Sequence, residues 1–359
     1  MMQDGIIAKW LTLSLFLYLL LRATRDNLSR ISMKRQVITL LLAILALTAT
    51  QAQQISVVTS SGATNLYSTL QEAIEGAAAG SVIYLPGGGF PIADEVKITK
   101  KVTIIGIGHK TRNENVDGNT IIGGNLWFNQ GSSGSAVMGC YISGNVNIGE
   151  DEKVDNILVK LCNLNGIQVH NSECKGLVVN QNYIRGDNNY GNATDVTISN
   201  NITSQIFQVA SGTIKNNIIC YGGNGNYHRL LYVNRSIINN NIINNEGISY
   251  DYIHYGSDCQ TSHNYLVNGG SWGDDPVIIE GATVNNLFEN LNGWAVNPMS
   301  NFHFTDDYEQ YETQVGIYAG TGFDDKQLPP TPYIVAKVIP ENTDAEGKLN
   351  IKVRVKAAE

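Results

Sequence analysis

The sequence predicts an all-β protein built as one parallel β-helix, with an N-terminal capping helix and a C-terminal β-hairpin. Three observations favour this fold class. The chain has 359 residues, more than the roughly 250–300 at which a single globular core stops growing. It contains 36 glycines but only 16 % charged residues, whereas helical enzymes are rich in Glu and Lys. A short phrase of apolar and Asn residues also recurs at a regular interval between about 157 and 290.

The N-terminus has the layout of an export signal. A charged stretch begins at Met33, the apolar run Val37–Leu47 follows, and Ala52 provides a small residue before a cleavage site. This order predicts a secretory signal peptide over 33–52, with an apolar run too short to span a bilayer. Because a complete signal begins at Met33, residues 1–32 are interpreted as an extension from a wrongly assigned start. If they are translated, a membrane anchor is the alternative.

We therefore expect a secreted, periplasmic or cell-surface protein. No cysteine precedes Cys140, so a lipid-modified cysteine directly after the signal is not predicted. Six basic and two acidic side chains lie in residues 1–52, a net charge of +4, which leaves −12 for the other 307 residues. Such an acidic body argues against nucleic acid as a partner, since phosphate binding depends on Lys and Arg clusters.

The recurring phrase consists of an apolar residue, a polar pair that usually contains Asn, and a second apolar residue. Its spacing of 16 to 24 residues indicates a solenoid, and alternating Ile and Val between Gly and Asn bends favour parallel β-coils over helical repeats. We interpret the Asn pairs as structural, because Asn tolerates left-handed bends and stacked Asn side chains form hydrogen-bonded ladders. The second Asn falls at positions 163, 182, 201, 217, 241, 264 and 286.

Five cysteines make a disulfide framework improbable, and the absence of a CxxC pair argues against zinc. Cys140 and Cys162 occupy the same place in successive repeats, so they should lie in neighbouring coils about 4.8 Å apart. We interpret them as stacked buried thiols, with a disulfide as the alternative, because in-register neighbours rarely meet the required dihedral angle. No metal or cofactor is predicted, and a Ca²⁺ site has no support in the residue pattern.

Both ends of the β-helix, predicted over 53–328, have candidate caps. Residues 66–77 place apolar side chains at helical spacing, and Ser81–Leu85 then reads as the first strand of the stack. Lys101–Gly108 opens the following coil. After a proline-rich boundary, residues 329–359 alternate as two strands around a turn, which predicts a terminal hairpin.

Three runs, Ser68–Ile74, Gly80–Gly88 and Val102–Gly106, resemble the N-terminal coils of the pectin-lyase-like right-handed parallel β-helix superfamily. The tail, Val315–Gly320 with Lys348–Val353, is similar to the ends of exported β-helix proteins from Bacteroides-type bacteria. This resemblance covers about residues 55–359 and implies a right-handed bacterial β-helix. It implies no particular activity, because the superfamily contains lyases, hydrolases, esterases and non-enzymes.

The catalytic phrases of pectate lyases and polygalacturonases are not recognisable. Asp274-Asp275 is the one Asp pair within the repeats, and we interpret it as a turn, with a calcium or catalytic role as the alternative. The remaining candidate acids and bases are interpreted as turn or core residues: Asp306-Asp307, Asp324-Asp325, His109, His170 and His303.

One patch combines aromatic rings with hydrogen-bonding groups, a combination that suits stacking on sugar rings. The alternative is that some of these rings point inward and only cover the side of the solenoid. Asp258 lies three residues after Tyr255, one of the rings of this patch. The candidate ligand-binding residues are Tyr227, His228, Arg229, Tyr232, Tyr250, Tyr252, His254, Tyr255, Trp272 and Asp274.

These observations predict an exported protein that binds a carbohydrate or another cell-surface polymer without cleaving it. A polysaccharide lyase or glycoside hydrolase with an unrecognised site is the first alternative, and a structural or adhesive surface protein is the second. Catalysis requires converging carboxylates or a carboxylate beside a base. Binding alone requires aromatic and hydrogen-bonding groups without that convergence.

Overall fold

The computed structural model describes residues 54–92, 95–110, 118–220, 230–244, 253–256, 258–267, 272–283, 285–291, 296–320, 322–330, 332–338, 348 and 351–356. The chain divides into two compact units, 1–52 and 53–359. The predicted extension and signal peptide lie outside the described residues and stay predictions. Within the described part, no helix is long and apolar enough to cross a bilayer.

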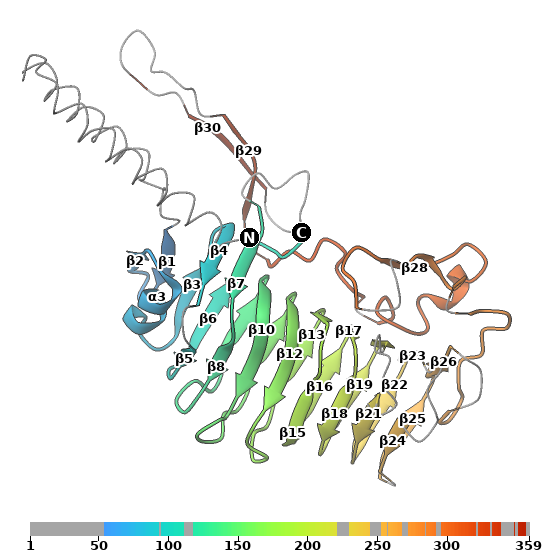
Figure 1. Cartoon of the computed structure of the whole chain (residues 1–359). Helices are drawn as coiled ribbons and strands as arrows, with labels where there is room; N and C mark the ends of the chain where they lie inside the picture. Colours follow the sequence, from blue (N-terminus) through green and yellow to red (C-terminus); the bar gives the residue numbers. More distant parts are fainter. Residues whose placement is uncertain are drawn as a thin grey trace, which may run out of the picture. The chain divides into compact units, whose positions relative to one another are not determined.

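Two long sheets of stacked parallel strands form a β-solenoid, which confirms the predicted fold class (Figure 1). The first sheet pairs parallel from β3 onward. Its strands, in pairing order, are β2 (Thr64–Tyr67), β1 (Ile55–Val58), β3 (Ser81–Tyr84), β6 (Val102–Ile105), β9 (Ala136–Met138), β11 (Leu158–Lys160), β13 (Val178–Asn180), β16 (Val196–Ser199), β19 (Gly212–Lys215), β22 (Ser236–Asn239) and β25 (Gln260–Ser262).

The second sheet has two limbs, which meet in the long strands β10 (Tyr141–Ile148) and β12 (Asn163–Val169). The first limb also contains β4 (Gly88–Pro91), β7 (Thr120–Gly123), β14 (Tyr183–Ile184), β17 (Ile202–Thr203), β20 (Ile218–Cys220), β23 (Ile242–Asn244) and β26 (Tyr265–Leu266). The second limb also contains β5 (Val96–Ile98), β8 (Leu126–Phe128), β15 (Asn189–Ala193), β18 (Ile206–Val209), β21 (Leu231–Val233) and β24 (Ile253–Tyr255).

Alternating side chains fill the space between the sheets. In β16, Val196 and Ile198 are fully buried while Thr197 between them is half-buried, as the sequence pattern predicts. Burial of each such aliphatic side chain stabilises the folded state by roughly 1.5–3 kcal/mol relative to its exposure to water. The core therefore grows by one layer with each coil, which explains how so long a chain forms one continuous stack.

A buried ladder of asparagines runs through five successive coils, as predicted. Each side-chain amide donates to the Oδ1 of the next Asn at 2.9 or 3.0 Å, and the backbone N–H donates to the same oxygen. The residue before each ladder position has a positive φ, so the ladder and the left-handed bend use different residues. The ladder consists of Asn182, Asn201, Asn217, Asn241 and Asn264, none more than 1 % exposed.

The structure corrects both ends of the predicted Asn series. Asn163 pairs with Tyr183, so Asn182 stacks over Cys162 and the repeat position there is a cysteine. Asn286 does not continue the stack, because its side chain closes a turn with Thr283 and Gly281 instead. The parallel sheets end at β25 and β26.

Cys140 and Cys162 lie in neighbouring coils as predicted, and both are buried free thiols. The Cys162 thiol donates to the carbonyls of Lys160 and Val137 at 3.2 and 3.7 Å. Asn217 donates to the two equivalent carbonyls of its own coil and the preceding one. Cysteine thus continues part of the ladder's hydrogen bonding, and burial raises the pKa of Cys162 to about 12, which keeps its thiol protonated.

The N-terminal cap is the predicted helix, α3 (Leu70–Gly76), which buries Leu70, Ala73 and Ile74. Thr69 and Glu72 form a reciprocal capping box at its start. The sequence pattern missed two strands here. β1 pairs antiparallel with both β2 and β3 and so extends the first sheet before the helix begins. Because Leu66 and Tyr67 belong to β2, the helix starts at Leu70 and not at 66 as the apolar spacing predicted.

After β26 the chain turns back over the solenoid. A short antiparallel pair, β27 (Phe288–Asn290) and β28 (Asn301–Phe304), precedes the turn η2 (Glu309–Tyr311). Residues 314–320 and 322–328, here called the strap, then hydrogen-bond to successive coils at left-handed corners and at His109. The predicted hairpin is present as β29 (Tyr333–Val338) and β30 (Lys352–Lys356).

The C-terminal segment buries an outer apolar row of the first limb. Aligned by strand register, this row pairs Tyr183, Ile202, Ile218, Ile242 and Tyr265. All five are buried in one cluster with strap and β28 residues that include Val315, Ile317 and Phe304. The first limb is therefore covered on its outside from β14 to β26, whereas outward-facing side chains of the second limb, such as Trp127 and Tyr232, are only half-buried.

Candidate functional site

The predicted ligand patch is only partly described by the structure. Tyr227, His228, Arg229, Tyr250 and Tyr252 lie outside the described residues. His254 and Tyr255 belong to β24, for which the structure describes the backbone. Tyr232, Trp272 and Asp274 have described side chains, and they do not meet at one place.

Tyr232 lies on the outer surface of the second limb, whereas Trp272 is 7 % exposed and packs in the solenoid core. Its ring therefore does not face a ligand, which corrects that member of the predicted patch. Asp274 is exposed, and its backbone bridges to Ser262 at the end of the first sheet. The positive φ of Asp275 agrees with the predicted turn.

Strand register places Tyr232 in a straight row of outward-facing side chains along the second limb. We call this row the outer file. The residues on either side of most of its members, such as Leu231 and Val233, are buried, whereas Phe207 is followed by an irregularity at the half-buried Gln208. The file begins after Lys97, and the backbone of His254 continues it on β24. Its described members are Trp127, Asn147, Gln168, Asn189, Phe207 and Tyr232.

Aromatic rings occupy both ends of the outer file. Trp127 stacks on His170 with ring centroids 5.5 Å apart, and the rings of Phe207 and Tyr232 lie 5.4 Å apart. Three amide side chains fill the positions between them. We call Trp127 with His170, and Phe207 with Tyr232, the two aromatic stations of the file. Four strand spacings of about 4.8 Å separate Trp127 from Phe207, so the stations are roughly 19 Å apart.

The amides of the file are held in place but retain hydrogen-bonding capacity. Gln168 donates to the carbonyl of Asp187 at 2.8 Å, and Asn189 accepts from the N–H of Gly191 at 2.8 Å. The Oδ1 of Asn147 lies 3.3 Å from the His170 ring. An amide carries two donors and an acceptor with two lone pairs, so the half-buried Gln168 and Asn189 have groups left for a polar ligand. Asn147 is only 4 % exposed and its Nδ2 is buried, so it lies beneath the surface of the file.

A hollow of about 340 Å³ opens at the C-terminal ends of β18, β21 and β24, beside Tyr232. Two of its residues, Asn192 and Arg235, have positive φ angles. Neither Arg235 nor Asp258 has an ion-pair partner among the described residues. The hollow is lined by Asn192, Ala210, Asn234, Arg235, Gly256 and Asp258.

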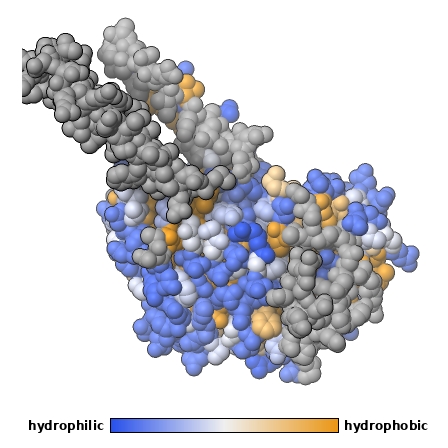
Figure 2. Space-filling view, in the orientation of Figure 1, coloured by the Kyte–Doolittle hydropathy of each residue, from blue (hydrophilic) through white to orange (hydrophobic). Residues whose placement is uncertain are grey.

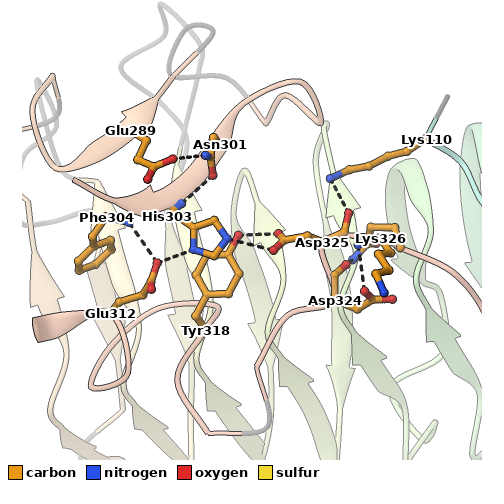
Figure 3. Close-up of polar contacts among 11 residues, drawn as sticks. Lys110, Glu289, Asn301, His303, Phe304, Glu312, Tyr318, Asp324, Asp325 and Lys326 are labelled. Atoms are coloured by element: carbon orange, nitrogen blue, oxygen red, sulfur yellow. Dashed lines mark hydrogen bonds and ion pairs between the residues drawn. The ribbon is translucent and has the colours of Figure 1, made fainter. Parts of the chain in front are cut away.

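A second polar cluster lies in the C-terminal segment, around His303 (Figure 3). The Nδ1 of His303 is 2.7 Å from Glu312 Oε1, and its Nε2 is 3.0 Å from Asp325 Oδ2. The Tyr318 hydroxyl donates to Asp325 Oδ1 at 2.6 Å, and the Tyr318 ring stacks on the imidazole at 4.1 Å. His303 and Asp325 thus have partners that the sequence reading did not predict, while Asp324 forms the predicted turn through Lys326 N–H.

The electrostatics of this cluster favour a structural clasp. Burial lowers the pKa of His303, but hydrogen bonds to Glu312 and Asp325 outweigh it and raise the pKa above its usual value. Burial and the hydrogen bond to Asp325 raise the pKa of Tyr318 well above its usual range, so its hydroxyl stays protonated. Both imidazole nitrogens are engaged by carboxylates, which leaves neither for proton transfer to a substrate.

His109 and His170, which are also interpreted as core or turn residues, occupy such places. His109 is 5 % exposed and lies 3.1 Å from Gln327 of the strap. His170 follows the end of β12 and stacks on Trp127. Within the described ranges, no group of three or more His, Cys, Asp or Glu side chains is arranged to hold a metal ion.

No protein-family model, curated protein or solved structure matches this chain. The parallel β-solenoid is therefore established by the structure itself, and the pectin-lyase-like and Bacteroides-type resemblances stay predictions.

Sequence reasoning found Tyr232 and the position of His254 but missed Trp127, Phe207 and Arg235. Trp127 and Phe207 lie in repeats whose lengths differ, so their place in a common row depends on strand register, and Arg235 lines the hollow rather than the row. The available signal was the alternation itself: Trp127 lies between the apolar residues Leu126 and Phe128, so it must face outward if they face inward.

Proposed function

We propose that the protein binds an extended carbohydrate polymer along the outer file without cleaving it. The observation that carries this proposal is the file itself, in which two aromatic stations about 19 Å apart are joined by three amides. A straight row with one side chain per coil suits a ligand that is itself extended and repetitive. The solenoid supplies this geometry because equivalent positions stack along its axis.

The chemistry of the file suits sugars. The apolar faces of pyranose rings pack on aromatic rings, while hydroxyl groups exchange hydrogen bonds with amides. The surface visible in Figure 2 is mainly hydrophilic with scattered hydrophobic residues, as expected for a protein whose ligand is polar. An apolar partner would need a continuous apolar patch instead.

The charges along the file favour a neutral polymer. From Trp127 to Tyr232 the aligned side chains are aromatic rings and amides. Lys97 precedes the file, and it lies 3.5 Å from Glu95 and 3.6 Å from Glu150, which offset its charge. Binding through stacking and neutral hydrogen bonds should change little with ionic strength, because salt screens exposed charges.

Binding rather than cleavage is favoured by the groups that the file presents. Glycoside hydrolysis uses two carboxylates about 5–9.5 Å apart, and eliminative cleavage uses a positioned base. The described side chains of the file supply stacking surfaces and amides. The export signal predicted over 33–52 would bring such a protein to extracellular polysaccharides.

Affinity electrophoresis in gels that contain individual neutral polysaccharides tests this proposal. We expect retardation on at least one polymer, weakened about five-fold for Trp127→Ala and for Tyr232→Ala, since an aromatic contact contributes about 1 kcal/mol. Tyr84→Ala is the matched control, because Tyr84 is an exposed ring on the first sheet, 39 % accessible. It should bind as the wild type does.

Three outcomes overturn the proposal. The first is retardation that is equally sensitive to Tyr84→Ala and to Trp127→Ala. The second is the release of reducing ends or of unsaturated products that absorb in the ultraviolet, because either would establish the lyase or hydrolase alternative. A protein that no polysaccharide retards would favour a structural role.

A further inference from the structure

We infer that the hollow beside Tyr232 holds one neutral sugar unit, at a chain end or on a side branch of the polymer. This inference rests on the proposed function and names the part of the ligand that the file does not contact. It follows from the size of the hollow, the groups that line it and its position relative to the file.

The volume of the hollow limits what fits. At about 340 Å³ it is near the lower end of the range of roughly 300–1,000 Å³ for small-molecule sites. That space accommodates one sugar ring and excludes a run of several rings. A polymer that lies on the file can therefore enter the hollow only with a terminal unit or a short branch.

The lining groups suit pairs of neighbouring hydroxyls. Asp258 can accept two O–H groups, the Arg235 guanidinium can donate to two oxygens, and the Asn192 and Asn234 amides both donate and accept. Among the described residues neither charged group has an ion-pair partner, so both are available to a ligand. One positive and one negative charge offset each other in the lining, so the hollow gives a carboxylated or sulfated sugar no net electrostatic advantage over a neutral one.

Chain geometry makes the hollow continuous with the file. Tyr232 faces outward, Val233 is buried, and Asn234 faces outward again at the start of the hollow. Ala210 follows β18, and Gly256 follows β24, in the same relation to their strands. A unit held by Asn234 is therefore next to a ring stacked on Tyr232.

Gly256 keeps the hollow open. A Cβ at this position would lie 2.6 Å from the Oδ1 of Asn234, a contact that real Cβ atoms do not make. Gly256→Ala therefore forces the Asn234 amide to move without altering any charge. This substitution tests the shape of the hollow separately from its electrostatics.

Isothermal titration calorimetry with methyl glycosides of neutral hexoses, and with a methyl glucuronide, tests the inference. We expect at least one neutral glycoside to bind and the glucuronide to bind no more tightly, because the charges of Arg235 and Asp258 offset each other. Asp258→Asn and Arg235→Asn should each weaken the neutral glycoside about ten-fold or more, as expected when a charge-assisted hydrogen bond is lost. Asn is chosen at 235 because it tolerates the positive φ.

Asp195→Asn is the matched control, since Asp195 is exposed at another left-handed corner and does not line the hollow. It should leave glycoside affinity unchanged. The inference is overturned if no neutral glycoside binds, if the glucuronide binds more tightly, or if Asp195→Asn weakens binding as much as Asp258→Asn does.

The two proposals fail in different ways. Retardation by a polymer that depends on Trp127 but not on Arg235, together with no glycoside binding, overturns the inference and leaves the proposed function standing. Glycoside binding that Gly256→Ala abolishes, in a protein that no polysaccharide retards, supports the hollow and overturns polymer binding on the file.

Discussion

Replacing one rung of the asparagine ladder tests how the solenoid is held together. The Asn217 side chain is fully buried, and its amide donates to Asn241 Oδ1, to the Ile198 carbonyl and to the Lys215 carbonyl at 2.9–3.0 Å. Its Oδ1 accepts from both the backbone N–H and the side-chain amide of Asn201 at 3.0 Å. Asn217→Ala therefore leaves several buried polar groups without partners.

Each buried group left unsatisfied costs about 1–3 kcal/mol, and partial rearrangement reduces the sum. We expect Asn217→Ala to lower the free energy of unfolding by about 4 kcal/mol, at the upper end for single substitutions. Asn217→Cys should cost less, because Cys162 shows that a thiol at this position donates to the same two carbonyls. It should still destabilise, since the thiol leaves Asn201 without its acceptor.

Urea denaturation followed by both circular dichroism and fluorescence measures these changes, and coincident transitions justify a two-state treatment. The matched control is Asn165→Ala, because the exposed Asn165 also donates to an Asn, at 2.8 Å to Asn145 Oδ1. That loss should cost less than about 0.5 kcal/mol. The reasoning is refuted if the buried and the exposed substitutions destabilise the protein equally.

Three further predictions concern the cap, the clasp and the signal peptide. Thr69→Ala removes the hydroxyl that caps α3 and should lower the free energy of unfolding by about 1 kcal/mol, measured in urea. The folded pKa of His303 is raised above its unfolded value of about 6.5, so its stabilisation is fully present below pH 6.5 and is lost as pH rises through the folded pKa. His303→Gln should therefore flatten the dependence of melting temperature on pH in that region. Mass spectrometry of the secreted protein should find Gln53 as its first residue.

Each of these has a clear contrary result. An unchanged urea midpoint for Thr69→Ala would mean that the capping box adds nothing to stability. A pH profile of His303→Gln that is parallel to the wild-type profile would contradict the clasp. A secreted protein that begins before residue 53 would contradict the predicted cleavage site.

The sequence was sufficient for the repeating part of the fold because coils impose local rules. Alternation fixes which side chains of β16 face inward, and left-handed corners favour particular residues. The sequence-based alignment of the Asn repeats was wrong by one residue at Asn163. Cys162 takes the ladder position there, and the repeat pattern gives no reason to expect a cysteine in place of an asparagine. A hydrogen-bonding role for a thiol becomes visible only when the neighbouring carbonyls are in place.

Contacts between distant segments were beyond the sequence pattern. Ile202 and Ile218 face outward, yet both are buried, because residues about 100 positions later cover them. The same limit applies to the site: the outer file depends on register across coils of unequal length, and the His303 clasp joins β28 to the strap. The spacing of residues along the chain therefore predicts neither the outer file nor the His303 clasp.

The choice of Asn at two left-handed corners, positions 200 and 216, has a second cause that a further substitution can isolate. Asn200 donates to the strap carbonyls of Ile317 and Ala319 at 2.7 and 3.3 Å, and Asn216 donates to Ala319 at 3.0 Å. If only the bend mattered, Asn200→Gly would be neutral, because glycine adopts a positive φ without strain. Since the amide also holds the strap, we expect a loss of about 1–3 kcal/mol.

Hydrogen exchange locates the effect of Asn200→Gly. The Gly316 N–H donates to the carbonyl of Asn240 at 2.8 Å, so faster exchange at Gly316 reports a loosened strap. Asn156→Gly is the control, because Asn156 is an exposed asparagine with a positive φ of 59° at a corner whose side chain does not contact the strap. If both variants are equally stable and Gly316 exchanges at the wild-type rate, the corner asparagines act only as bend residues. Faster exchange in Asn200→Gly alone means that one residue type both turns each coil and fastens the segment that covers it.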